Sequence, residues 1–256
     1  MTFAWLAFFD AILAIAMIGA GMVGAHFRLI APFMGFQLFA LGFLLSVIGT
    51  LVGLLAIFLT RTPQAQAGRK RAVLATVVCV LIAVPIFLTL ISSRKYPPIN
   101  DITTDFDNPP EFTYAEQLQH EPNRDMKYNK TKYADRQVQG YGPIGPIKEH
   151  LDPTAAFARV TEVAKASPSW TITYNDPATK TIEVVATSKL WHFNDDVVIQ
   201  VRPAPDGTSL IEMRSKSRDG IGDFGVNARR IRHFFDRVAL ARSPSDQNPT
   251  TDEDQP

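Results

Sequence analysis

The sequence predicts a membrane protein in which three transmembrane helices are followed by an α+β domain outside the bilayer. The first observation is the uneven distribution of charge. From Met1 to Thr60 the only charged side chains are Asp10 and Arg28, whereas the sequence after Arg94 is as polar as a globular domain. The second is that three apolar stretches reach the length of about twenty residues that a helix needs to cross a hydrocarbon core of about 30 Å. The third is a series of strand-like runs between two amphipathic segments near the C-terminus.

The three apolar stretches run over about residues 3–25, 33–59 and 72–91, so residues 1–93 form the membrane part. A cleaved signal peptide is a poor alternative for the first stretch, because residues 1–5 lack the basic start that such a peptide needs. Buried core helices are a poor alternative for all three, because a domain of this size cannot bury three helices that are apolar on every side.

The orientation follows from the basic residues, which are retained on the cytoplasmic side of a membrane. The second loop carries four basic residues, which are Arg61, Arg69, Lys70 and Arg71. The opposite side carries three, which are Arg28, Arg94 and Lys95. This small excess predicts a cytoplasmic N-terminus and a periplasmic or extracellular C-terminal domain. We expect the bacterial inner membrane as the location and the lipid bilayer as the first partner.

Two features of the membrane part are candidates for function. Asp10 is the one acidic residue inside a span, and an intramembrane carboxylate is a candidate for proton or ion handling. Its position near one end of the helix also suits contact with headgroups or with Gln37. Small residues recur at helical spacing, as in Ala16, Ala20 and Gly24, and in Gly35, Gly42, Gly49 and Gly53. Such stripes predict close helix packing, either within one bundle or by self-association between copies of the chain.

The rest of the chain divides into a strap, a domain and a tail. Seven prolines interrupt residues 94–151, which predicts an extended strap or linker whose aromatic residues pack at its ends. Residues 152–242 form the α+β domain, which begins with a helix capped by Asp152 and ending before Pro168. Four antiparallel strands are expected at 170–174, 181–193, 196–202 and 208–218, followed by a helix at about 226–241. Helices cover one face of this sheet, and the acidic tail 243–256 is expected to be disordered.

Composition and spacing argue against several classes of function. The net charge of +1 gives no basic surface for nucleic acid. The single Cys79 can form neither an intrachain disulfide nor a thiolate zinc site, and the isolated His192 and His233 do not suggest a metal site. Residues 220–225 match the GxGxxG pattern, but no parallel strand follows the helix after them, so we expect a glycine turn and no cofactor.

A cluster of charged residues at the last strand is the main candidate site. Alternation places Arg214 and Arg218 on one face of that strand, and the carboxylates nearest to them are those of Asp195 and Asp196. These two neighbours point apart, which is a poor arrangement for an acid and base pair. Asp223 is expected to cap the final helix. The cluster is interpreted either as a structural clasp or as an anion site, with Arg218 or Arg229 as ligands.

Four segments carry a resemblance to a known family. They are Asp195-Asp196-Val197-Val198-Ile199, Arg214-Ser215-Lys216-Ser217-Arg218, and the stretch from Asp223 through Asn227 to Arg232, with Pro97-Pro98-Ile99-Asn100-Asp101-Ile102 before them. Over roughly residues 97–238 the chain resembles the family numbered domain of unknown function 1499. Similar proteins occur in bacterial envelopes and in plastids, often behind membrane helices. The resemblance implies no activity, cofactor or catalytic residue.

Three functions remain open at this point. The preferred hypothesis is a membrane-anchored extracytoplasmic module that binds a partner, for example another envelope protein, with cell-envelope maintenance as its broadest role. The second is an envelope hydrolase that uses Asp195 or Asp196, and the absence of a recognised nucleophile motif argues against it. The third is a carrier of a lipid or another apolar ligand, which would need a deep pocket lined by Trp191 and Phe193.

Overall fold

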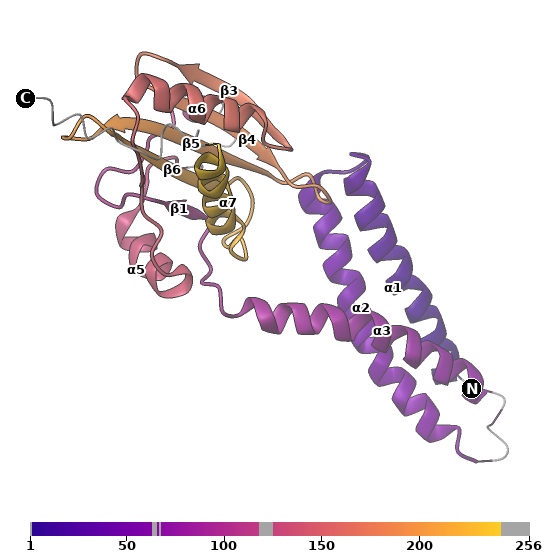
Figure 1. The fold of residues 1–256 in the computed structure, drawn as a ribbon. Coiled ribbons are helices and arrows are strands. Elements are labelled where there is room, and N and C mark those ends of the chain that lie inside the picture. The colour runs from indigo at the N-terminus through magenta and orange to yellow at the C-terminus, as the bar shows by residue number, and fades with distance from the viewer. Residues whose placement is uncertain (1, 63–65, 67, 118–124, 242–256) are drawn as a thin grey trace, which may run out of the picture. The chain divides into compact units, whose positions relative to one another are not determined.

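The computed structural model describes residues 2–62, 66, 68–117 and 125–241 (Figure 1). The chain divides into two compact units. The helical unit comprises residues 1–95 with the turn Ser188–Phe193, and the sheet unit comprises residues 96–187 and those from 194 onward. The acidic tail expected at 243–256 lies outside the described residues.

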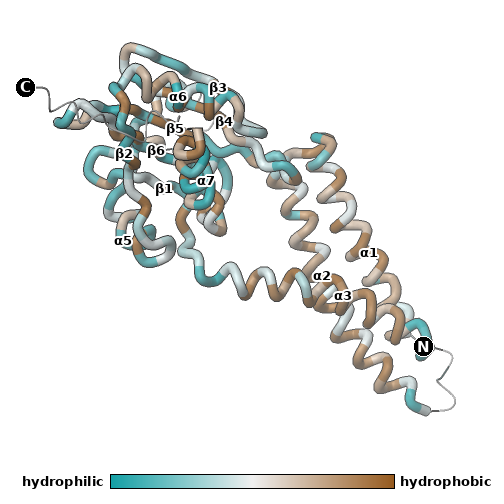
Figure 2. The backbone as a smooth tube through the Cα atoms, in the orientation of Figure 1, coloured by the Kyte–Doolittle hydropathy of each residue, from teal (hydrophilic) through white to brown (hydrophobic). Residues whose placement is uncertain are grey.

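The helical unit contains α1 (Thr2–His26), α2 (Pro32–Leu59) and α3 (Arg69–Ser93). All three are long and apolar enough to cross a membrane, and Figure 2 shows hydrophobic residues along most of their length. Their large side chains are exposed, while most of their buried positions are Gly and Ala. A water-soluble bundle has the reverse arrangement, because large apolar side chains fill its interior. The three apolar helices expected from the sequence are confirmed.

Glycines of α1 and α2 let the backbones of these two helices approach each other closely. A Cβ atom added at Gly21 would lie 2.4 Å from the carbonyl oxygen of Gly35, and one added at Gly42 would lie 2.9 Å from that of Ala14. Real Cβ atoms do not approach a backbone oxygen so closely, so a side chain at either position would force the helices apart. The predicted stripe Gly35, Gly42, Gly49 and Gly53 is buried and therefore packs within one bundle, whereas Ala16 and Ala20 of the stripe predicted in the first helix are exposed. Self-association through the small residues stays a prediction.

Within the described residues, the sheet unit contains six antiparallel strands in place of the four expected. The strands are β1 (Asp101–Thr103), β2 (Ile147–Glu149), β3 (Trp170–Asp176), β4 (Thr181–Thr187), β5 (Asn194–Pro203) and β6 (Ser209–Ser217). Their order is β1-β6-β5-β4-β3, and β2 pairs with the other end of β6. Asp101 lies opposite Lys216 and Ile147 opposite Ile211. The two additional strands have only three residues each, which is too short to give a periodic signal in a proline-rich segment.

Helices α6 (Pro153–Lys165) and α7 (Val226–Leu240) cover one face of the sheet (Figure 1). The Asp152 carboxylate accepts hydrogen bonds from the amides of Thr154 and Ala155, at 2.8 and 3.2 Å, so the predicted cap is confirmed. The expected apolar faces of both helices are buried in the main core together with inward side chains of β4, β5 and β6. This core includes Phe157, Val160, Ala164, Ile182, Val184, Val197, Ile199, Ile211, Met213, Ile231, Phe234 and Val238.

The proline-rich segment is more structured than the extended strap that the sequence suggested. Besides β1 and β2 it contains α4 (Tyr114–Gln117) and α5 (Lys130–Tyr141). Asn129 caps α5 by accepting a hydrogen bond from the amide of Lys132 at 2.9 Å. The buried face of α5 is narrow and partly polar, because it includes Gln137 beside two tyrosines, and such a face has weak helical periodicity. The expectation that the aromatic residues of this segment pack is confirmed by the burial of Phe112, Tyr133 and Tyr141.

This segment also covers the second face of the sheet, where the sequence had suggested helices on one face only. Phe112, Ala115 and Met126 form a small core with Val198 of β5. The buried carboxylate of Glu183 accepts hydrogen bonds from the amides of Tyr114 and Ala115, at 2.9 and 2.8 Å. Both faces of the sheet are therefore covered, and the folded unit begins at Tyr96 instead of at Asp152.

Candidate functional site

The two neighbouring carboxylates Asp195 and Asp196 lie on opposite faces of β5, as alternation along a strand requires. Asp195 forms an ion pair with Arg230 on the face covered by α7. Asp196 accepts hydrogen bonds from Arg218 on the other face, the shortest at 2.7 Å. Each carboxylate is thus paired with its own arginine, and the two do not face a common cleft.

A polar network joins α7 to β6 on the first face. The Asn227 side chain is fully buried, accepts a hydrogen bond from the Ser215 hydroxyl at 2.6 Å and donates one to the Ser217 hydroxyl at 2.9 Å. Asp223 accepts hydrogen bonds from the amides of Gly225 and Asn227, at 2.9 and 2.7 Å, so it caps the helix as expected. Because these donors and acceptors satisfy one another, Asn227 and Asp223 hold the helix in place and leave no free group for a ligand.

The Asp223 carboxylate has one further contact of interest, with the hydroxyl of Tyr141 at 3.2 Å. Burial, followed by the charge of Asp223, raises the pKa of Tyr141 above its ordinary value. Arg229 lies apart from this network, since it donates to the carbonyl oxygen of Phe224 at 3.0 Å and lies over the ring of Tyr96. Arg229 therefore does not join Arg218 in one site.

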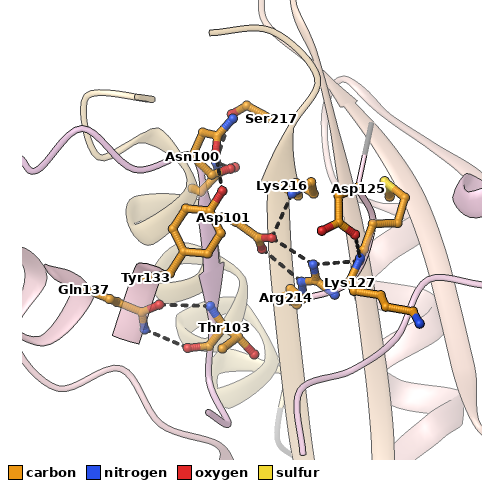
Figure 3. Close-up of polar contacts among 12 residues, drawn as sticks. Asn100, Asp101, Thr103, Asp125, Lys127, Tyr133, Gln137, Arg214, Lys216 and Ser217 are labelled. Carbon is orange, nitrogen blue, oxygen red and sulfur yellow. Dashed lines mark hydrogen bonds and ion pairs between the residues drawn. The ribbon is translucent and has the colours of Figure 1, made fainter. Parts of the chain in front are cut away.

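The second face holds a buried charge cluster, which Figure 3 shows in close-up. The fully buried carboxylate of Asp101 accepts two hydrogen bonds from Arg214, at 2.9 and 2.8 Å, and one from Lys216 at 3.0 Å. Arg214 is only 1% exposed and also donates to the carbonyl oxygen of Met126 at 2.8 Å. A fork-shaped pair of this kind is among the strongest charge-assisted contacts in proteins. It fixes β1 and the residues before α5 to β6.

Gln137 completes the attachment of β1. Its side chain accepts a hydrogen bond from the amide of Thr103 at 3.1 Å and donates one to the carbonyl oxygen of the same residue at 2.7 Å (Figure 3). A side-chain amide thus takes the place of a neighbouring strand at the outer edge of β1. This contact positions α5, and with it the basic residues at the start of that helix.

Above the buried cluster lies a cleft of about 310 Å³, which we call the basic cleft. It is formed where the end of β6 meets the start of β1 and the residues around the start of α5. Its described lining residues include four cations and one acid, namely Lys127, Lys132, Lys216 and Arg218 with Asp125. Such an excess of positive charge in a concave surface concentrates anions from solution.

The four cations of the basic cleft differ in how they are held. Lys216 and Arg218 are fixed by the carboxylates of Asp101 and Asp196 beneath them. Within the part of the chain that the structure describes, the ammonium groups of Lys127 and Lys132 have neither an ion pair nor a hydrogen bond, although Lys132 lies 4.9 Å from the centre of the Tyr133 ring. Among the described residues, the cleft therefore combines two cations that are held by carboxylates with two that are not.

Of the predicted site residues, only Arg218 lines the basic cleft, and Arg214 lies buried beneath it. Sequence reasoning missed Asn100, Lys127 and Lys132, because they come from the segment interpreted as a strap. A signal for them was present, since residues 127–132 hold three lysines within six positions. Among the described residues no group of three or more His, Cys, Asp or Glu side chains could hold a metal ion.

Asp10 lies in a separate place, inside the helical unit. One of its carboxylate oxygens is buried and has no hydrogen-bond partner among the described residues. A Cβ atom added at Gly49 would lie 2.1 Å from this oxygen and 2.7 Å from the sulfur of Cys79. The suggested contact between Asp10 and Gln37 is wrong. Gln37 belongs to the end of α2 where Gly35 packs against Gly21, and this end is far along α1 from Asp10.

Comparison with known proteins gives a family but no activity. The family described as "Protein of unknown function (DUF1499)" matches residues 101–238, which include the strands of the sheet, α5 to α7 and the charged cluster. The match begins at β1, so the earlier helices lie outside it. No curated protein matches the chain.

Proposed function

The chain belongs to the family described as protein of unknown function (DUF1499), and we propose that it is a membrane-anchored binding module whose basic cleft binds an anionic group. The observation that supports this function is the pair of lysines, Lys127 and Lys132, that face the cleft without a carboxylate partner among the described residues. Phosphate, phosphate ester and carboxylate groups fit this donor set, because ammonium and guanidinium groups donate charge-assisted hydrogen bonds to all three.

The preformed shape of the cleft supports the same proposal. Asp101 and Asp196 hold Lys216 and Arg218 in position before any ligand arrives. A ligand then has to order the side chains of Lys127 and Lys132 only, which have no ion pair among the described residues, and a smaller loss of conformational entropy increases affinity. The volume of about 310 Å³ suits a headgroup or a small anion better than a long apolar molecule.

The helical unit supplies the proposed anchor. Three helices are long and apolar enough to cross a membrane, and the basic second loop favours a cytoplasmic N-terminus. In that orientation the sheet unit lies outside the cytoplasm, in the periplasm if the host membrane is a bacterial inner membrane. Cell-envelope maintenance is the broadest role that follows, with anionic envelope components or other envelope proteins as partners.

The alternatives have less support. A hydrolase that uses Asp195 or Asp196 needs a carboxylate that is free to act on a substrate, and each of these two is paired with an arginine. A carrier of apolar ligands needs a cavity, and the expected lining residues Trp191 and Phe193 lie in the turn between β4 and β5, outside the core beneath α6 and α7.

The experiment is thermal unfolding of the full chain in nanodiscs of zwitterionic lipid, with inorganic phosphate as the probe. Phosphate at about 100 times its dissociation constant stabilises a binding protein by about 2.7 kcal/mol. We expect stabilisation of the wild type and its loss in the double variant Lys127→Gln, Lys132→Gln. The matched control is Lys130→Gln, because Lys130 lies between the two lysines in sequence but forms an exposed ion pair with Asp107. Equal stabilisation of all three proteins by phosphate would reject the basic cleft as the site.

A further inference from the structure

The loop from Asp219 to Gly225, between β6 and α7, exposes large apolar side chains to solvent. Outside the three long helices, eight large hydrophobic residues of the described chain are exposed. Two of them, Ile221 and Phe224, lie in this loop, and a third, Val226, directly follows it as the first residue of α7. Ile221 is 84% exposed and Phe224 is 52% exposed. Clustered apolar side chains of this kind mark a surface that contacts a partner or a membrane.

The backbone of the loop holds these side chains outward. Phe224 has a φ angle of 51° and Gly225 one of 78°, and a left-handed conformation is unfavourable for a residue with a bulky side chain. Gly225 cannot carry a side chain, because an added Cβ atom would lie 2.9 Å from the ring of Tyr96. The close approach of Gly225 to Tyr96 thus fixes the loop at the point where the ring of Phe224 is exposed.

Several contacts attach the loop to the residues that directly follow α3. The amide of Asp223 donates a hydrogen bond to the carbonyl oxygen of Ile99 at 3.2 Å, and the Asn100 side chain donates one to the carbonyl oxygen of Gly220 at 2.7 Å. Tyr96 is the third residue after Ser93, the last residue of α3. Three extended residues span at most about 11 Å. The loop is therefore attached to the first residues of the sheet unit, which follow α3 in the chain.

The apolar loop is also continuous with the basic cleft, because Gly220 and Ile221 form part of the cleft lining beside Arg218 and Lys216. A surface that combines exposed apolar side chains with lysines and arginines binds to membranes that contain anionic lipid. Free phosphate would gain no favourable contact with the neighbouring apolar side chains. The arrangement favours a ligand that has an anionic headgroup next to acyl chains.

We propose that this loop and the basic cleft together dock the sheet unit onto the membrane that holds its own helices, with Ile221 and Phe224 among the acyl chains and the phosphate of an anionic phospholipid in the cleft. This inference rests on the proposed function, both for the anchor and for the anion site. It adds the chemical class of the ligand and a fixed position of the domain at the bilayer surface.

The test places an environment-sensitive fluorophore on the full chain in nanodiscs. Cys79 is the only cysteine of the chain, so Cys79→Ser with Phe224→Cys gives a single labelling site. The matched control is Val138→Cys on α5 in the same background, because Val138 is 52% exposed, as is Phe224. Lipids with a quencher in the upper acyl region report contact with the bilayer, and nanodiscs with and without phosphatidylglycerol separate the effect of headgroup charge.

We expect the label at position 224 to be quenched in anionic nanodiscs and the label at position 138 to remain unquenched. Each lysine near an anionic surface adds to the free energy of binding. The double variant Lys127→Gln, Lys132→Gln should therefore lower the ratio of docked to undocked domain about 30-fold. Equal quenching at the two positions would overturn the inference. If phosphate still stabilises the wild type in that case, only the lipid ligand is rejected, whereas loss of both effects rejects the anion site as well.

Discussion

The buried charge cluster beneath the basic cleft allows a quantitative prediction for Asp101→Asn. This substitution keeps the shape of the side chain but removes the negative charge that faces Arg214 and Lys216. The exposed fractions of the three side chains are 0%, 1% and 9%, so water cannot replace the lost carboxylate. Removal of one partner from a buried ion pair costs about 3–5 kcal/mol, because it leaves an uncompensated buried charge.

The structure places the expected loss near the lower end of that range. Arg214 keeps a hydrogen bond to the carbonyl oxygen of Met126 at 2.8 Å, and its guanidinium lies 5.0 Å from the centre of the Phe112 ring. We therefore expect Asp101→Asn to lower the free energy of unfolding of the sheet unit by about 3 kcal/mol. That is a large share of the 5–15 kcal/mol typical of a whole protein. Adding Lys216→Met should recover part of the loss, because it removes one of the two like charges.

The assay is native-state hydrogen exchange of the full chain in nanodiscs, read at the amides of β5 and β6. Their slowest exchange reports the free energy of opening of the unit. The control is Asp107→Asn, the same substitution at an exposed ion pair with Lys130, for which no measurable change is expected. A loss below about 1 kcal/mol for Asp101→Asn would refute the reasoning, because it would mean that the cluster behaves like a solvated surface pair.

Three further predictions concern topology, pH and helix packing. Alkaline phosphatase fused after Arg242 should be active in a bacterial host and a fusion after Gly68 inactive, and the opposite pattern would reverse the proposed orientation. The raised pKa of Tyr141 means that the folded state holds this proton more tightly than the unfolded state, so stability should fall as the pH rises above about 10. Urea unfolding at pH values from about 9 to 11 should show a shallower fall in Tyr141→Phe, and equal slopes would contradict this assignment. Gly21→Ala should destabilise the helical unit in detergent because its Cβ atom would meet a backbone oxygen of α2, whereas Gly19→Ala, with no atom within 4 Å, should not. Equal melting temperatures for the two variants would contradict the packing.

The parts of the candidate site that could be predicted from the sequence follow from two local rules, the alternation of side chains along a strand and the capping of helices. Alternation along a strand requires Asp195 and Asp196 to point apart, and the ion pairs to Arg230 and Arg218 follow that rule. Asp223 was predicted to cap α7 because a carboxylate before a helix accepts its free amides. Lys127 and Lys132 were missed because their contribution depends on which surface their segment covers, and no local pattern encodes that.

The sequence by itself determined the three apolar helices, the capped α6, the amphipathic α7 and the positions of the strands β3 to β6, because each depends on a periodicity or a capping residue that is visible within one segment. The strand expected at 181–193 is shorter in the structure, because β4 ends at Thr187 and residues 188–193 form a turn. Only the tertiary structure decided the rest. The three-residue strands β1 and β2 exist because β6 offers them an unpaired edge. The pairing of Asp101 with Arg214 joins residues that lie 113 positions apart in the chain. The basic cleft likewise arises from three distant segments, because buried ion pairs and edge pairing hold them together in the folded chain.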